Sequence, residues 1–372
     1  MANVPTEDQE QLREVTRRFL ADKASPEAMR ALVESGARRD DTVWTQMATQ
    51  LGLHGLAVPE EFGGAGLGPV ELGIVLEEMG RAVFVGPFFS TVAVAGQLLT
   101  AVDDAEAQVA WLPGIVDGSL TATVAISDAD GSFDLSGVAT QAVEGADGWA
   151  LTGVKEFVID GARADLVLVA ARIGDEVGLF ACEGATDGLV REQVDGLDPT
   201  RPFARLVLDA VPARRIGGDV AEVLRHVGDL VAAALACEQV GGASRALEMA
   251  VDYAKIREQF GRPIGSFQAI KHKCADLLVE IESGRSAALA AVDLLAGADE
   301  EGPVAAAVAQ AWCAAAYTHA AKENIQIHGG IGYTWEHDAH FHLKRAKSSE
   351  LLLGTTAQHR VRVAALAGIR EN

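Results

Sequence analysis

The sequence predicts an α+β protein in which a helical N-terminal domain, a central β-barrel and a C-terminal four-helix bundle follow one another along 372 residues. Three changes of pattern carry this prediction. Apolar residues recur at helical intervals in residues 1–118, short strand-like runs fill residues 119–215, and long alanine-rich helical patterns occupy residues 220–372. A chain of this length has room for two or three domains. The three ranges are therefore the expected domains: 1–118, 119–215 and 220–372.

The N-terminal region is expected to be mostly helical. Residues 7–23 and 41–53 space their apolar side chains three or four positions apart, as amphipathic helices do. Residues 57–72 are rich in Pro and Gly and therefore predict a loop. Helical spacing returns in residues 68–83.

The central region consists of short runs rich in Val, Leu and aromatic residues. Turn residues separate these runs, and no helical pattern lies between them. Consecutive short strands of this kind suggest an antiparallel barrel or sandwich. The expected strands are residues 121–127, 148–159, 164–172, 177–183 and 204–211.

Four long helical patterns follow in the C-terminal region, and many of their residues are alanine or glycine. Small residues allow helices to approach closely, which suits a four-helix bundle. The patterns cover residues 220–257, 264–297, 302–329 and 340–354.

Composition excludes several classes of partner. The formal net charge of −22 repels nucleic acid and anionic membranes. No apolar run reaches the roughly 18 residues that indicate a membrane span, and the polar, acidic first residues are not typical of a signal peptide. The four cysteines form no CxxC pair, so we expect free thiols in a reducing, cytoplasmic compartment.

Four stretches together resemble the acyl-CoA dehydrogenase family. They are residues 51–82, 151–171, 257–277 and 325–338, which read LGLHGLAVPEEFGGAGLGPVELGIVLEEMGRA, LTGVKEFVIDGARADLVLVAA, REQFGRPIGSFQAIKHKCADL and IQIHGGIGYTWEHD. The resemblance implies the same order of helices, barrel and bundle. It also implies FAD as cofactor and an acyl-CoA as substrate: the flavin takes a hydride from Cβ, a glutamate takes the Cα proton, and the product is a trans-2-enoyl-CoA.

In this family one subunit cradles the flavin ring and its neighbour contacts the pyrophosphate and adenosine end. The resemblance implies that the neighbour's contribution is intact here. The alternative for the arginine of REQFG is a surface ion pair with Glu258. The cofactor-binding positions that the resemblance implies are Arg257, Phe260, Gln268, Gln326, Gly329, Gly330 and Thr355.

Both positions at which the family carries its catalytic base are apolar in this sequence. One lies near the C-terminus and is Leu353; the other lies on the first bundle helix and is Val231, followed by Ala232. Neither side chain can accept a proton, so no catalytic residue is expected there. Glu238 lies two helical turns after Val231 on the same face, and it is either a relocated base or a structural carboxylate.

The positions that the family uses around the flavin ring are also altered. A run whose hydroxyl faces the flavin reads Phe157-Val158-Ile159, without a hydroxyl. The phosphate-binding loop reads SDADGS (127–132), where Asp128 and Asp130 would repel a pyrophosphate. Ser132 matches the serine of that loop weakly.

The positions that serve a neighbour's flavin are thus kept, while the base and flavin-ring positions are altered. In this respect the chain is similar to the non-catalytic subunit of heteromeric (α2β2) acyl-CoA dehydrogenases of actinobacterial steroid side-chain degradation. The implied partner is a homologous catalytic subunit, which shares FAD with this chain. Two alternatives stay open: an active homomeric dehydrogenase that uses Glu238, and a flavin-free acyl-CoA-binding scaffold. The sequence does not identify the acyl group.

Histidines and basic residues near the C-terminus have competing interpretations. His337, His340 and His342 resemble a metal cluster in composition, but positions five apart do not share a helical face, and we expect no metal. Lys344, Arg345 and Lys347 are grouped at 344–347, which predicts either a patch for CoA phosphates or a partner, or a solvated helix face.

Overall fold

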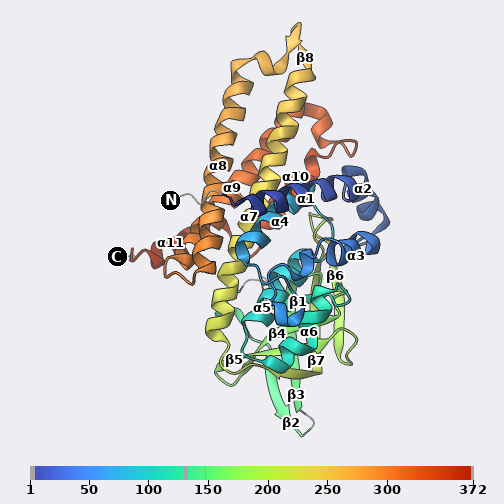
Figure 1. Cartoon of the computed structure of the whole chain (residues 1–372), viewed down its shortest axis with the longest axis vertical. Coiled ribbons are helices and arrows are strands. Elements are labelled where there is room, and N and C mark those ends of the chain that lie inside the picture. Colours follow the sequence, from blue (N-terminus) through green and yellow to red (C-terminus); the bar gives the residue numbers. More distant parts are fainter. Residues whose placement is uncertain (1–4, 130–132, 147, 370–372) are drawn as a thin grey trace. The chain divides into compact units, whose positions relative to one another are not determined.

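The computed structural model describes residues 5–129, 133–146 and 148–369. These residues form two compact units (Figure 1). We call the first the bundle unit; it comprises residues 1–35, 69–84 and 232–372. We call the second the barrel unit; it comprises residues 36–68 and 85–231.

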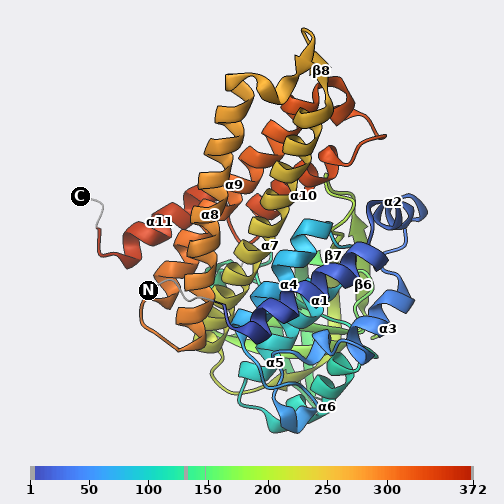
Figure 2. The same ribbon diagram turned by 45° about the horizontal axis from the view of Figure 1, so that its top comes forward.

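Long helices dominate the bundle unit. In both views α8 and α9 run side by side, with the short strand β8 at one end (Figures 1 and 2). The first helix begins with a capping box, in which Thr6 and Gln9 satisfy each other's backbone N–H groups. The helices of this unit are α1 (Glu7–Lys23), α2 (Pro26–Ser35), α4 (Pro69–Ala82), most of α7 (Ala221–Ile256), α8 (Gln268–Ala296), α9 (Gly302–His328), α10 (Ala339–Leu351) and α11 (Thr356–Leu366).

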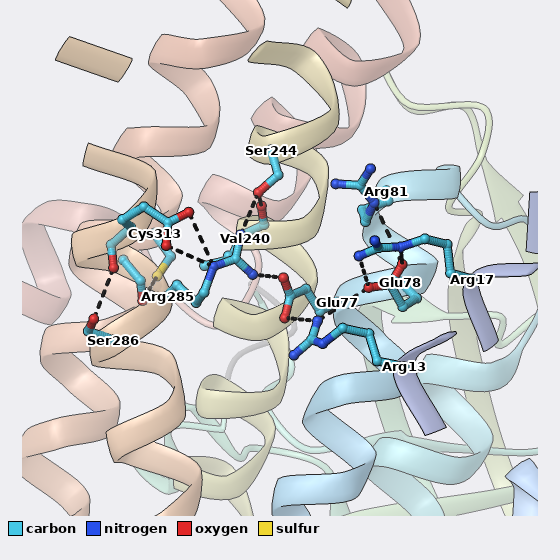
Figure 3. A network of polar contacts seen from close by, with 12 residues as sticks. Arg13, Arg17, Glu77, Glu78, Arg81, Val240, Ser244, Arg285, Ser286 and Cys313 are labelled. Carbon is cyan, nitrogen blue, oxygen red and sulfur yellow. Dashed lines mark hydrogen bonds and ion pairs between the residues drawn. The ribbon is translucent and has the colours of Figure 1, made fainter. Parts of the chain in front are cut away.

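A chain of ion pairs ties α1, α4 and α8 together (Figure 3). The carboxylate of Glu77 lies between Arg13, at 2.7 Å, and Arg285. Glu78 accepts two hydrogen bonds from the guanidinium of Arg17, each 2.8 Å long. Both glutamates are buried, so each charge needs these partners to offset the loss of hydration.

Helices α4 and α7 touch backbone to backbone. A Cβ atom added to Gly80 would overlap with the carbonyl oxygen of Glu238, and one added to Gly241 would overlap with the carbonyl oxygen of Glu77. Glycine is therefore the residue that permits this crossing, because any side chain would push the two helices apart.

The strands of the barrel unit close into a ring. Pairing runs from β4 to β2, β3, β7 and β5 and returns to β4, while β1 and β6 are attached to β4 and β7. Buried apolar side chains such as Leu151, Phe180 and Leu206 fill its core. The strands are β1 (Ala122–Ala125), β2 (Gln141–Gly145), β3 (Gly148–Ile159), β4 (Leu166–Ile173), β5 (Glu176–Glu183), β6 (Leu189–Val194) and β7 (Phe203–Ile216).

Helices accompany the ring within the barrel unit: α3 (Asp41–Thr49), the π-helix η3 (Phe89–Gly96), α5 (Gln97–Ala101) and α6 (Ala105–Val116). All residues of η3 are buried. The hydroxyl of Thr91 in η3 donates to the backbone carbonyl of Ala122 and accepts from its N–H. Both backbone groups of the first residue of β1 are therefore hydrogen-bonded by η3.

The predicted fold class is confirmed: helices, a central barrel and a helical bundle follow one another. The expectation of antiparallel pairing alone is wrong, because β1 pairs with β4 in parallel. The patterns also missed β2, β6, α2, η3, α5, α6 and α11. The three-way division at residues 118 and 220 stays a prediction, since the two compact units are each built from separate stretches of chain.

None of the helices among the described residues is long and apolar enough to cross a membrane. All four cysteines are free thiols; Cys182, Cys237 and Cys313 are buried and Cys274 is partly buried. Burial raises the pKa of each of the three buried thiols to about 12.

Candidate functional site

One end of the bundle unit gathers the end of α7, the hairpin of β8 (Glu258–Gln259) and β9 (Arg262–Pro263), the start of α8 and the end of α9 (Figure 2). The rings of Tyr253 and His328 stack at 4.3 Å, which joins α7 to α9. Lys273 and Glu323 form an ion pair of 2.5 Å, which joins α8 to α9. Six of the seven predicted cofactor-binding residues lie on these segments.

Arg257 directly follows α7, and its guanidinium is exposed. Its backbone holds the hairpin in place, because the N–H donates to Tyr253 and the carbonyl accepts from Ile264. No ion pair involves this guanidinium in the part of the chain that the structure describes, so the alternative pairing with Glu258 is not observed. A guanidinium in this state is available to an external anion.

Phe260 is 93% exposed at the tip of the hairpin, an unusual position for a large apolar side chain. Its backbone and that of Gly261 are left-handed, with φ of 55° and 76°. Two such residues between short strands form the tight turn that hairpins favour, and a non-glycine residue there is strained. The turn fixes an aromatic ring in solvent.

Gln268, the first residue of α8, and Gln326, near the end of α9, are both exposed. Gly329 ends α9 with φ of 64°, and neither it nor Gly330 has any atom within 4 Å of an added Cβ. The surface around this glycine pair is thus open enough for the backbone of Gly329 and Gly330 to meet a ligand.

Thr355 lies apart from the other six. The 13 residues of α10 span about 20 Å between the neighbourhood of Gly330 and the loop that contains Thr355. Its hydroxyl accepts from the N–H of Gln358 in a capping box at the start of α11. Helix capping therefore explains this threonine locally, and its contact with flavin remains a prediction.

The two positions at which a base was predicted to be missing carry apolar side chains, Val231 and Leu353. Val231 lies on α7 and is completely buried. Leu353 follows α10 in a left-handed conformation, with φ of 65°. Neither position offers a proton acceptor.

Glu238 is buried and forms an ion pair with Arg345, with Oε1 and Nη1 3.0 Å apart. Arg345 also donates to the carbonyl of Phe84. To accept a proton, Glu238 would have to give up the partner that offsets its burial. This geometry is that of a structural carboxylate. The same pair removes Arg345 from the predicted basic patch, because Arg345 is 3% exposed, whereas Lys344 and Lys347 are partly buried.

At the altered flavin-ring positions, β3 carries an irregular register against β7 between Lys155 and Val158. Phe157 has φ of 53° and is 45% exposed. Ile159 follows, and its carbonyl accepts a hydrogen bond from the Thr123 hydroxyl. The Ile159 side chain offers no group able to hydrogen-bond a flavin nitrogen.

The carboxylate of Asp128 has hydrogen-bond and ion-pair partners within the barrel unit. It accepts from the N–H and hydroxyl of Thr140, at 2.6 and 2.8 Å, and pairs with the buried ammonium of Lys155 at 2.5 Å. Burial lowers the pKa of Lys155, and the bond to Asp128 partly opposes that shift. Lys155 therefore compensates the charge of Asp128 inside the barrel unit, and the expected repulsion of a pyrophosphate stays a prediction. Asp130 and Ser132 lie outside the described residues.

The sequence carries a signal for the pair of Lys155 and Asp128. Lys155 lies four residues after the inward-facing Leu151. Because side chains of a strand alternate between its two faces, the side chain of Lys155 is expected to point into the barrel as well. A buried lysine requires a carboxylate partner, and Asp128 on the preceding loop supplies it.

The histidine-rich stretch is used for packing. His342 is buried and hydrogen-bonds to the hydroxyl of Tyr317 at 3.1 Å, while Trp335 packs edge-on against His340 at 4.7 Å. Within residues 5–129, 133–146 and 148–369, no group of three metal-ligating side chains is arranged to hold an ion.

Two family models match the chain. The acyl-CoA dehydrogenase N-terminal domain matches residues 6–119, and the acyl-CoA dehydrogenase C-terminal domain matches residues 229–367. The acyl-CoA dehydrogenase IpdE2 of Mycobacterium tuberculosis is 35% identical over 350 residues, which cover 94% of each chain. This chain belongs to the acyl-CoA dehydrogenase family.

Solved acyl-CoA dehydrogenase structures agree. The chain is similar to a variant of the Tcur3481-Tcur3483 steroid ACAD, with a TM-score of 0.88, 35% identity and coverage of 97% and 98% of the two chains. It is also similar to the ChsE4-ChsE5 complex from Mycobacterium tuberculosis, with a TM-score of 0.89, 27% identity and 99% coverage of both chains. The predicted resemblance to heteromeric steroid acyl-CoA dehydrogenases is thereby confirmed.

Members of the acyl-CoA dehydrogenase family bind FAD. The exposed end of the bundle unit fits the diphosphate part of that cofactor, because it presents the guanidinium of Arg257 and an open glycine pair. The positions of β3 predicted to face the flavin ring fit it poorly, because Ile159 and the exposed Phe157 carry no hydrogen-bonding side-chain group.

Proposed function

We propose that this chain is the subunit of a heteromeric acyl-CoA dehydrogenase that lacks the catalytic base and completes the FAD site of a homologous catalytic partner. The observation that carries the proposal is an asymmetry. Both base positions, Val231 and Leu353, are apolar, whereas the residues suited to a neighbour's cofactor are exposed at one end of the bundle unit.

In this proposal, Arg257 binds the pyrophosphate of FAD through charge-assisted hydrogen bonds. Its guanidinium also offsets locally the field of a protein with a net charge of −22. Phe260 supplies an apolar surface beside it, and Gln268 and Gln326 supply neutral amide contacts. Gly329 and Gly330 let the backbone approach the cofactor closely.

When bound, FAD would supply the acceptor for a hydride from Cβ of an acyl-CoA thioester. The Cα proton must go to a carboxylate, and neither Val231 nor Leu353 can receive it. The paired state of Glu238 disfavours it as a substitute. The partner subunit therefore supplies the base in this proposal, and the reaction forms an α,β-unsaturated acyl-CoA.

The substrate class in this proposal is a steroid side-chain acyl-CoA. Its support is the similarity to a solved protein described as a steroid ACAD, over 97% of this chain. The expected assembly is a dimer of unlike dimers. Similarity to a chain of the ChsE4-ChsE5 complex, which joins two named components, supports an assembly with an unlike partner.

The test compares the chain alone with the chain co-expressed with the product of an adjacent dehydrogenase gene. Purified alone, it should carry little flavin; the co-purified complex should carry FAD and oxidise acyl-CoA. In the complex, Arg257→Ala should leave assembly intact and weaken FAD binding about tenfold or more, since 1.4 kcal/mol corresponds to one decade.

Arg225→Ala is the matched control, because Arg225 is an exposed arginine on α7 remote in sequence from the hairpin. Stoichiometric FAD in the isolated chain, with turnover, would favour the homomeric alternative. A complex in which the Arg257 and Arg225 variants retain FAD equally well would contradict the proposed contact. A chain that binds acyl-CoA but no FAD in either preparation would be the scaffold instead.

A further inference from the structure

The barrel unit contains a pocket of about 380 Å³ that the proposed function does not use. All of its lining residues belong to that unit. They come from the segment leading into α3, the residues before η3, the start of β1, the turn after β3, the end of β6 and the approach to β7. A volume of this size lies at the lower end of the range for small-molecule sites, roughly 300–1,000 Å³.

Two guanidinium groups at this pocket lack a carboxylate partner among the described residues: those of Arg38 and Arg163. Arg38 is partly buried; its Nη1 makes one long hydrogen bond, 3.4 Å, to the carbonyl of Pro199, and its Nε is buried without any partner among those residues. Arg163 is exposed at the rim. A partly buried, uncompensated cation favours a nearby anion.

The carboxylates at the pocket already have partners. Asp41 pairs with Arg39 at 2.6 Å. Asp165 accepts from the N–H and the hydroxyl of Thr121, at 2.9 and 2.7 Å. Asp160 accepts from the hydroxyl of Ser90 at 2.6 Å. Among the described residues, no ion pair joins any of these three acids to Arg38 or Arg163.

The rest of the wall is largely apolar and small. Pro87, Ala122, Ala162, Ala164 and Phe203 line it beside the two arginines. A cavity of this kind accommodates an apolar body, while the guanidinium groups fix one charged end.

We infer that this pocket binds a small organic acid, whose carboxylate pairs with Arg38 and Arg163 and whose apolar body contacts Pro87, the alanines and Phe203. The site is separate from the proposed cofactor contacts: no residue predicted to bind FAD lines it. The inference therefore stands or falls independently of the proposed function.

The test is isothermal titration of the full chain with sodium benzoate as the probe, at low ionic strength. We expect saturable binding of one benzoate per chain. Arg38→Gln should weaken this binding at least tenfold and Arg163→Gln about threefold or more. Arg225→Gln removes the same charge elsewhere in the barrel unit and should leave the affinity unchanged.

Inorganic phosphate is the second probe, and it should bind more weakly than benzoate because it makes no apolar contacts. Equal affinity for phosphate and benzoate would overturn the assignment to an organic acid. The absence of benzoate binding at millimolar concentration, or unchanged affinity in either pocket variant, would overturn the site itself. Because Arg163 is exposed, its variant tests the inference even if Arg38→Gln fails to fold.

Discussion

At the scale of single residues, Glu238 and Arg345 form an ion pair whose side chains are 5% and 3% exposed. Removing one partner from a buried pair leaves an uncompensated charge, which typically costs about 3–5 kcal/mol. Replacing both partners by apolar residues of similar size costs far less. Comparing the stability of the single and the double variant therefore tests whether Glu238 is a structural carboxylate or a catalytic base.

We therefore expect Glu238→Gln to lower the free energy of unfolding by about 3 kcal/mol, because Arg345 loses its counter-charge. The double variant Glu238→Leu, Arg345→Met should recover most of that loss. Urea unfolding monitored by circular dichroism measures both. Loss of turnover in Glu238→Gln without any loss of stability would instead support the relocated base.

A carboxylate at Leu353 should not create a competent enzyme. The left-handed backbone at this position, with φ of 65°, and the absence of a hydroxyl on Ile159 both remain in Leu353→Glu. We expect turnover of the isolated chain to stay within tenfold of the Leu353→Gln control in a dye-reduction assay. Turnover by Leu353→Glu in the range of roughly 1–10³ s⁻¹ that is typical of enzymes would contradict a broadly altered site.

For the candidate site residues, the sequence predicted which side chains are exposed together but not which tertiary partners they have. Motif spacing located the exposed group around Arg257, because helix ends and a short hairpin fix where those side chains lie. It did not reveal that Lys155 of β3 compensates the charge of Asp128. Tertiary partners of this kind depend on strand register, which a single sequence does not display.

At the scale of secondary structure, periodicity predicted the elements that bury one clear face. The predicted ranges for α1 and β3 match their observed bounds. Strand β2 was missed because one residue of its five, Ala142, is buried, so its sequence lacks the alternation of a half-buried strand. Helix α6 was missed because Pro113 interrupts its pattern.

The crossing of α4 over α7 should be intolerant of a single methyl group. In Gly241→Ala the new Cβ overlaps with the Glu77 carbonyl, so we expect a loss of about 1–3 kcal/mol in the free energy of unfolding. The control Gly218→Ala places its Cβ in open space and should change stability by about 0.5 kcal/mol or less. Equal stabilities of the two variants would show that the helices separate without cost.

At the scale of the whole molecule, buried histidines make stability depend on pH. Burial lowers the pKa of His54 to about 4 and that of His342 to about 3, from 6.5. Above pH 6.5 these histidines are neutral in both the folded and the unfolded chain. As the pH falls from 6.5 towards 4, these histidines become protonated in the unfolded chain but stay neutral in the folded chain, so the free energy of unfolding decreases.

Each such histidine should contribute a slope of about 1.4 kcal/mol per pH unit in this window. We expect His342→Gln to reduce the dependence of unfolding free energy on pH between 6 and 4 by about that amount, whatever its effect at pH 7. The exposed His226, changed to Gln, is the control and should leave the slope unchanged. An unaltered slope in His342→Gln would contradict burial of a neutral imidazole.

The state of the four thiols makes this chain well suited to site-specific labelling. Cys182, Cys237 and Cys313 are buried, and their raised pKa values keep them as unreactive thiols. Burial also raises the pKa of Cys274, but this thiol is only partly buried, so maleimides should react with it before the other three. The single change Cys274→Ser would then give a background free of reactive cysteine. A fluorophore on a cysteine introduced at Gln268 would report, by its change in emission, when another chain covers that end of the bundle unit.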